Sequence, residues 1–349
     1  MDFFAHQDKA RKHTKLLVVY FAIAVACIIA SVYLASLVIF YGTQSQQQPG
    51  NPTPELVLWN PKLFFYAMLG TLGVVLVGSL YKTAELAKGG SAVAESLGGR
   101  LISPNPANPD ERKLQNVIEE MAIASGVPVP KIYVLDEDEG INAFAAGHAP
   151  GDAAIGVTRG CMTLLNRDEL QGVIGHEFSH LLNGDMRLNL RVMGVIFGIL
   201  CLAVIGRILL YSRSRRDKNP LMLLGLALII IGAIGTFFGR LIQAAISRQR
   251  ESLADASSVQ FTRNPAGLSG ALQKIGGVGS LIESPHAGEA NHIFFSDGLG
   301  KPFFRMMATH PPLAERIRAI DPSWDGKFKH VSGSQSLKAD GRIPQQPNG

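Results

Sequence analysis

Four long apolar segments most strongly constrain what this chain can fold into. The first runs from Leu16 to Tyr41, an almost unbroken apolar stretch of 26 residues. As a helix it is long enough to cross about 30 Å of hydrocarbon with some tilt. The other three segments cover residues 63–81, 192–210 and 221–238. The sequence therefore predicts an integral membrane protein with about four transmembrane helices.

The composition agrees with a membrane protein and excludes two other classes. Hydrophobic residues make up 47% of the chain and charged residues only 17%. The formal net charge of +5 comes from basic residues beside the apolar runs, without interleaved aromatic residues. We interpret these residues as anchors at the bilayer, and we expect no nucleic-acid partner. The three cysteines lack metal-ligand spacing and do not indicate a disulfide framework.

The charges around the first two apolar segments predict their orientation. Residues 1–15 are basic, whereas residues 42–55 contain no Lys or Arg. By the positive-inside rule, both ends of this transmembrane hairpin (residues 16–83, with spans at about 16–41 and 63–81) point to the cytoplasm. A cleaved signal peptide is the competing interpretation. The first apolar run is longer than a signal sequence requires, so we favour an uncleaved anchor.

The second hydrophobic hairpin, residues 192–238, leaves its topology open. The loop between its two segments carries an excess of basic residues, namely Arg213, Arg215, Arg216 and Lys218 against Asp217. A full crossing would leave this loop outside, against the positive-inside rule. Either the first hairpin fixes the topology and the second one follows, or the second hairpin does not fully cross the bilayer. We expect it to cross.

A short motif before the second hairpin indicates metal chemistry. His176, Glu177 and His180 form a His-Glu-x-x-His pattern. On a helix, residues four apart lie on the same face, so the two imidazoles can bind one zinc ion. Glu177 lies beside the first ligand, where its carboxylate can take a proton from water at the metal. The alternative is an amphipathic helix with two histidines and a solvated glutamate.

The surroundings of the motif favour the metal site. Asn166 and Glu169 form a capping box for a helix that begins just before the motif. A catalytic zinc usually has three protein ligands, and Glu251 is the best candidate for the third. Asp255 follows one helical turn later, where it can accept a hydrogen bond from a ligand imidazole. The competing interpretation of Glu251 is an exposed residue paired with a nearby arginine.

Three motifs in order resemble peptidase family M48, a family of membrane zinc endopeptidases, and in particular its HtpX branch. They are His-Glu-x-x-His at 176–180, Arg-Glu-x-x-x-Asp at 250–255, and Thr-His-Pro-Pro-Leu-Ala-Glu-Arg-Ile at 309–317. The resemblance implies one zinc ion per chain, bound by His176, His180 and Glu251, with Glu177 as the catalytic base. It also implies that His310 and Arg316 contact the substrate or the oxyanion.

The rest of the chain predicts a mainly helical, zincin-like protease domain of the α+β class with a small β-sheet. Its first part covers residues 84–191 and its second part residues 239–322. A linker (84–107), a helix capped by Asn108, and strands at 131–135, 142–146 and 153–158 are expected in the first part. Residues 323–349 read as a disordered tail. Asn142, Ala143 and Phe144 resemble the family's edge strand, which pairs with an extended substrate; a plain core strand is the alternative.

The HtpX resemblance implies cleavage of misfolded or damaged membrane proteins in quality control and stress response. We expect a multi-pass protein of the cell (inner) membrane with its active site facing the cytoplasm. A CAAX-type prenyl protease is the second reading, but four apolar segments are few for its membrane chamber. A scaffold with structural zinc is the third, and an open site beside Glu177 argues against it. The sequence gives neither the substrate nor the oligomeric state.

Overall fold

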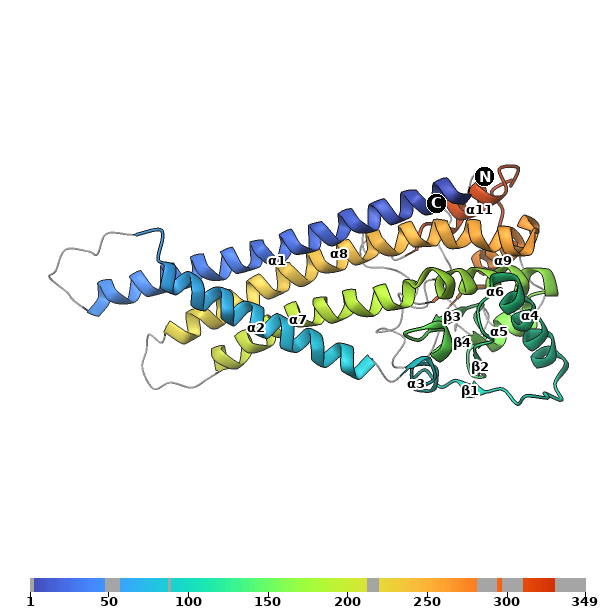
Figure 1. Ribbon diagram of the computed structural model, residues 1–349, viewed down its shortest axis with the longest axis horizontal. Helices are drawn as coiled ribbons and strands as arrows, with labels where there is room; N and C mark the ends of the chain where they lie inside the picture. The colour runs from blue at the N-terminus through green and yellow to red at the C-terminus, as the bar shows by residue number, and fades with distance from the viewer. Residues whose placement is uncertain are drawn as a thin grey trace. The chain divides into compact units, whose positions relative to one another are not determined.

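The computed structural model describes residues 3–47, 57–86, 89–211, 220–280, 294–296 and 310–329. Within these residues the protein is mainly helical with one small β-sheet, as the sequence predicts (Figure 1). The chain divides into two compact units. The site unit comprises Met1–His13, Leu86–Asn189 and Ala244–Gly349, and the helical unit comprises Thr14–Glu85 and Leu190–Gln243.

Four long helices carry the predicted apolar segments. They are α1 (Phe3–Gln47), α2 (Pro61–Leu86), α7 (Asp185–Tyr211) and α8 (Pro220–Thr262). Each is long and apolar enough to cross a membrane. Each also extends beyond the apolar segment that predicted it. The basic loop between α7 and α8 lies outside the described residues at 212–219.

The helical unit packs through a small apolar core and close backbone approaches. The core consists of Ile28, Val32, Val75, Ile199, Leu202 and Leu228. Glycines allow the helices to come this close, because a Cβ atom on Gly198 would lie 2.2 Å from the carbonyl oxygen of Val75. Many large apolar side chains of this unit remain exposed, Val77 and Leu80 among them. This inverted pattern, with apolar residues facing outward, is what a lipid environment requires.

The site unit contains a four-stranded mixed sheet in the order β1-β2-β4-β3. β2 (Lys131–Leu135) and β4 (Ala154–Thr158) are parallel, whereas β1 (Arg100–Leu101) and β3 (Ala143–Ala146) join them antiparallel. The three strands predicted from the sequence are therefore present, each within one residue of its expected bounds. β3 forms one edge of the sheet.

The segment at residues 84–107, predicted to be a linker, instead carries regular secondary structure. It contains the helix α3 (Gly89–Ser96) and the strand β1. Gly90 explains the docking of α3, because a Cβ atom there would lie 2.2 Å from the carbonyl oxygen of Ala146. The small residues that suggested a flexible linker are thus needed for close packing on the sheet.

The remaining helices surround the motif helix α6 (Arg167–Asn183). They are α4 (Pro109–Ser125), the short α5 (Arg159–Leu164), α9 (Pro265–Val278) and α11 (Leu313–Ile320), with a 3-10 turn at Pro150–Asp152. Asn108 caps α4 as predicted. Asn166 and Glu169 form the predicted capping box of α6. Four apolar side chains of α6 are buried, namely Leu170, Val173, Ile174 and Leu181.

Glycine on α6 brings α8 close to the motif. The hydroxyl of Ser258 on α8 donates a hydrogen bond of 2.6 Å to the carbonyl oxygen of Gly172. A Cβ atom on Gly172 would lie 2.7 Å from the backbone nitrogen of Leu268 on α9. The close approach at Gly172 is to α9, whereas Gly175 faces α8, where an added Cβ atom would lie 3.1 Å from the hydroxyl of Ser258.

The predicted disordered tail begins too early. Trp324 and Phe328 pack against the core of the site unit, and the backbone N–H of Lys329 donates to the carbonyl oxygen of Gln273. These two aromatic side chains supply apolar area for packing, although the segment is mostly polar in composition. Residues 330–349 lie outside the described residues.

Candidate metal centre

The His-Glu-x-x-His motif occupies the middle of α6 and is buried. His176 and His180 lie one helical turn apart, and their Nε2 atoms are 3.1 Å from each other. Two ligands of a tetrahedral zinc ion at about 2.0–2.1 Å from the metal are ~3.3 Å apart. Both ring nitrogens therefore point to one position that suits a metal ion.

Glu251 approaches the same position from α8. Its carboxylate lies 3.5 Å from Nε2 of His176 and 3.5 Å from Nε2 of His180. The three side chains form a group that could hold a metal ion, with ligand atoms within 4.8 Å of one another. The structure thus brings together the three ligands proposed from the sequence, although they are 75 residues apart along the chain.

His176 is held by a carboxylate and an arginine behind it. Its Nδ1 lies 2.9 Å from Oδ1 of Asp255, the residue predicted to orient a ligand imidazole. Arg316 donates to both oxygens of Asp255, at 2.9 Å from Nε and 2.7 Å from Nη2. A hydrogen bond from Nδ1–H leaves the Nε2 lone pair free for a metal ion.

Charge at the centre favours a cation. Burial opposes the imidazolium form, but the carboxylates of Glu251 and Asp255 outweigh it and raise the pKa of His176. The pKa of His180 is raised well above its usual range, because Asp185 and Glu251 likewise outweigh its burial. Since two facing Nε2 lone pairs repel each other, a divalent cation between them satisfies both rings and the carboxylate. The donor set of two imidazoles and one carboxylate matches that of catalytic zinc sites.

Glu177 directly follows the first proposed ligand and has no hydrogen-bond partner for its carboxylate among the described residues. Its side chain is 1% exposed, and neither carboxylate oxygen accepts a hydrogen bond from the described residues. Burial raises the pKa of Glu177, while His180 and His176 act in the opposite direction. An isolated buried carboxylate is costly unless it has a function. A water molecule or a substrate group is the natural partner for it.

His310 also reaches the centre. Its Nδ1 lies 3.0 Å from Oε2 of Glu251, and the residue is 9% exposed. Arg316 is placed differently from what the family pattern implies. Besides Asp255, its guanidinium donates to the carbonyl oxygen of Phe295 and lies 4.7 Å from the Phe295 ring. These contacts favour a positioning role through Asp255, and contact of either residue with the reacting carbonyl stays a prediction.

The edge strand β3 is already paired along part of its outer side. The backbone N–H of Phe295 donates to the carbonyl oxygen of Ala143 at 2.7 Å, and Phe144 forms an antiparallel bridge with Phe294. The Asn142 side chain donates to the carbonyl oxygen of Ser296 and accepts from its N–H. In this conformation the predicted substrate-pairing residues bind the chain's own segment at 294–296.

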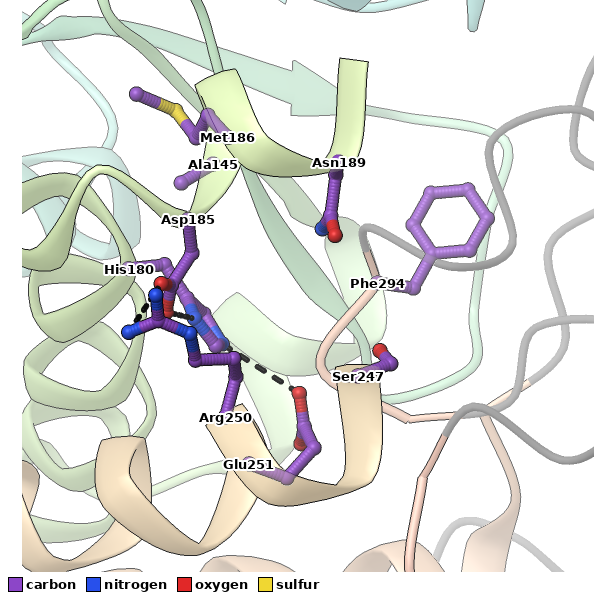
Figure 2. A pocket seen from close by; sticks show the side chains of 9 residues that line it. All are labelled: Ala145, His180, Asp185, Met186, Asn189, Ser247, Arg250, Glu251 and Phe294. Atoms are coloured by element: carbon purple, nitrogen blue, oxygen red, sulfur yellow. Dashed lines mark hydrogen bonds and ion pairs between the residues drawn. The ribbon is translucent and has the colours of Figure 1, made fainter. Parts of the chain in front are cut away.

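A pocket opens beside the metal position (Figure 2). His180 and Glu251 line it together with Ala145 of β3. Its other walls come from α7, α8 and the 294–296 segment, and consist of Asp185, Met186, Asn189, Ser247, Arg250 and Phe294. The pocket therefore combines an apolar side with polar groups, next to both the sheet edge and two of the proposed ligands.

Sequence reasoning missed the contacts that the buried Asp185 and the partly exposed Arg250 make at this site. Nδ1 of His180 lies 2.9 Å from Oδ2 of Asp185, and Oδ1 of Asp185 lies 3.0 Å from Nη1 of Arg250. The sequence could have indicated Asp185, because this residue directly follows an Asn-Gly pair typical of a helix end and lies five residues after His180. Gly184 adopts the left-handed conformation (φ 68°) that ends α6 and lets the chain turn back.

Sequence comparisons show the family to which this chain belongs. A model of peptidase family M48 matches residues 108–323. The "Protease HtpX homolog" of Caldanaerobacter subterraneus subsp. tengcongensis is 42% identical over 62% of this chain and 73% of that protein. The homologue from Thermoanaerobacter pseudethanolicus is 37% identical over 77% of this chain and 91% of that protein. The homologue from Streptococcus gordonii is 36% identical over 72% of this chain and 85% of that protein. The solved structure "Crystal Structure of S. mikatae Ste24p" has a TM-score of 0.45 at 18% identity, covering 90% of this chain and 66% of that chain.

The apolar helices and the buried His-His-Glu group define a membrane metallopeptidase. More particularly, the chain belongs to peptidase family M48 and is similar to its HtpX homologues.

Removal of any one proposed ligand is expected to lower bound zinc well below one ion per chain. The variants are His176→Ala, His180→Ala and Glu251→Ala, measured as the zinc-to-protein ratio of detergent-purified protein. His148→Ala, a histidine outside the metal group, is the control and should bind zinc as the wild type does. Asp255→Asn should weaken binding by about 10–100-fold, because it touches a ligand and not the metal. Stoichiometric zinc in Glu251→Ala would exclude Glu251 as the third ligand.

Proposed function

We propose that this protein is a zinc-dependent endopeptidase that cleaves misfolded or damaged membrane proteins on the cytoplasmic side of the cell membrane. The observation that carries the enzymatic part is the partnerless, buried carboxylate of Glu177 beside the His176, His180 and Glu251 group. A structural zinc site is normally closed by four protein ligands. The group here has three members, and in this proposal a water molecule that contacts Glu177 takes the fourth position.

The chemistry divides between the metal and the side chains. A zinc ion bound there polarises the scissile carbonyl and acidifies water. Glu177 takes a proton from the attacking water and returns it to the leaving amine. In this proposal His310, whose Nδ1 lies 3.0 Å from Oε2 of Glu251, donates a hydrogen bond to the oxyanion.

Two features support a peptide as the substrate. β3 presents a sheet edge next to the metal position, and an extended peptide can join such an edge by main-chain hydrogen bonds. The pocket beside His180 and Glu251 would take a side chain next to the scissile bond. The 294–296 segment must then leave the edge at Ala143, or the peptide must pair beyond it.

The membrane location and its orientation support the choice of substrate. Four apolar helices tether the site to the bilayer, so membrane proteins are the polypeptides at highest local concentration. The basic N-terminus and the absence of Lys and Arg from segment 42–55 favour a cytoplasmic site. The names of the similar proteins specify a protease and no substrate, so the substrate class is part of this proposal.

Glu177→Gln is expected to retain zinc and lower kcat by about 10²–10⁴-fold, because general acid–base steps contribute that much. Cleavage of a model membrane protein by detergent-purified protein, with and without a chelator, provides the assay. Glu119→Gln on the exposed face of α4 is the matched control and should cleave as the wild type does. Activity of Glu177→Gln within tenfold of wild type would exclude Glu177 as the base.

Reporter fusions test the orientation. A fluorescent protein fused after residue 349 should fluoresce in cells, and alkaline phosphatase fused there should be inactive, because both indicate a cytoplasmic end. Alkaline phosphatase inserted at residues 212–219 should be active if α7 and α8 cross the bilayer. An active phosphatase after residue 349 would place the site outside and overturn the proposed orientation.

A further inference from the structure

The second proposed ligand, His180, has its own carboxylate and arginine. Its Nδ1 lies 2.9 Å from Asp185 Oδ2, and the other oxygen of Asp185 pairs with Arg250 at 3.0 Å. Figure 2 shows the Asp185 carboxylate in contact with both the His180 ring and the Arg250 guanidinium. Asp185 is 3% exposed, so water contributes little to holding this arrangement.

The arrangement repeats the one behind His176. There, Nδ1 contacts Asp255, and Arg316 pairs with that carboxylate. Both ligand imidazoles thus have Nδ1 directed to a buried carboxylate and Nε2 directed to the same point. A carboxylate that accepts from Nδ1–H fixes the ring's tautomer and orientation and makes Nε2 a better ligand.

The local backbone explains why Asp185 can reach His180. α6 ends at Asn183, and Gly184 turns the chain so that α7 starts at Asp185. Arg250 comes from α8, where it directly precedes the third proposed ligand, Glu251. The ion pair therefore connects the end of the motif helix to the turn of α8 that carries Glu251.

We propose that Asp185 and Arg250 are a positioning pair that holds the His180 ring as a metal ligand and fixes it relative to Glu251. The inference rests on the proposed zinc site and adds to it. Arg250 pairs with the buried carboxylate of Asp185 and orients it, and Asp185 in turn keeps the Nε2 lone pair of His180 directed at the metal. Both residues also line the pocket beside the metal position, so zinc affinity is the readout that isolates the positioning role.

A simpler role is possible for such a pair, so the test must separate the two. An acidic residue at the start of a helix, paired with an arginine on a neighbouring helix, can merely join α7 to α8. In that case its loss lowers the melting temperature and affects zinc only through unfolding. A positioning role instead changes zinc affinity in protein that remains folded.

The experiment compares zinc dissociation constants, obtained by chelator competition, with melting temperatures of the metal-free protein. Full-length, detergent-purified Asp185→Asn should bind zinc about 10–100-fold more weakly, as expected for a partner of a ligand histidine. Its metal-free melting temperature should stay close to that of the wild type. Arg250→Gln should weaken binding in the same direction, and Arg250→Lys, which keeps a cation, should lose less.

A double variant shows whether the two residues act together. Zinc binding by Asp185→Asn with Arg250→Gln should be weaker than wild type by less than the product of the two single losses, since they remove one shared interaction. Asp136→Asn, which removes an exposed partner of Arg100 away from the metal, is the control and should leave zinc affinity unchanged.

Two results would overturn the inference. One is wild-type zinc affinity in Asp185→Asn. The other is a loss of zinc matched by an equal loss of folded, metal-free protein. Failure of the proposed function would look different, because the wild-type chain itself would then fail to bind zinc or to cleave protein.

Discussion

The structure of the site depends on one electrostatic constraint, the burial of several ionisable side chains around a single point. The Nε2 atoms of His176 and His180 face each other at 3.1 Å, with the Glu251 carboxylate 3.5 Å from each. Isolated buried charges cost several kcal/mol each unless they are paired. A divalent cation resolves this by accepting all three donors at once. Asp255 with Arg316, and Asp185 with Arg250, then determine which nitrogen of each ring faces the metal.

Packing around α6 makes this convergence possible. Most of the motif helix is buried, and its glycines lie against neighbouring helices, Gly172 against α9 and Gly175 against α8. Glu251 and Asp255, one turn apart on α8, then meet His176 and His180 on α6. The same two helices, α7 and α8, supply the second pair of candidate membrane spans and both residues of the Asp185–Arg250 pair. Elements that anchor the chain in the bilayer therefore also complete its metal site.

Much of this could be predicted from the sequence, because the decisive signals are local. Apolar length identified the four long helices, short strand-like runs identified β2, β3 and β4, and Asn166 with Glu169 marked the start of α6. Local pattern alone could not identify Glu251 and Asp255, because the histidines of α6 that they contact lie far earlier in the chain. The resemblance to the M48 motifs identified both residues. Other features depend on packing that local pattern does not encode. Gly90 reads as a linker residue until the sheet beneath it is known, and Trp324 and Phe328 lie in a polar segment that nevertheless joins the core. Nor did the pattern of β3 reveal that residues 294–296 pair with its edge.

The most direct test of the central claim is the coordination shell of the bound metal. X-ray absorption at the zinc edge, measured on the purified wild-type chain, reports ligand type and distance without any assay of activity. Two imidazole nitrogens at about 2.0–2.1 Å and oxygen donors at about 2.0–2.2 Å are predicted. His180→Ala should remove one imidazole contribution from any zinc that remains bound. Sulfur at about 2.3 Å, or a shell closed by four protein nitrogen and sulfur donors, would contradict the account.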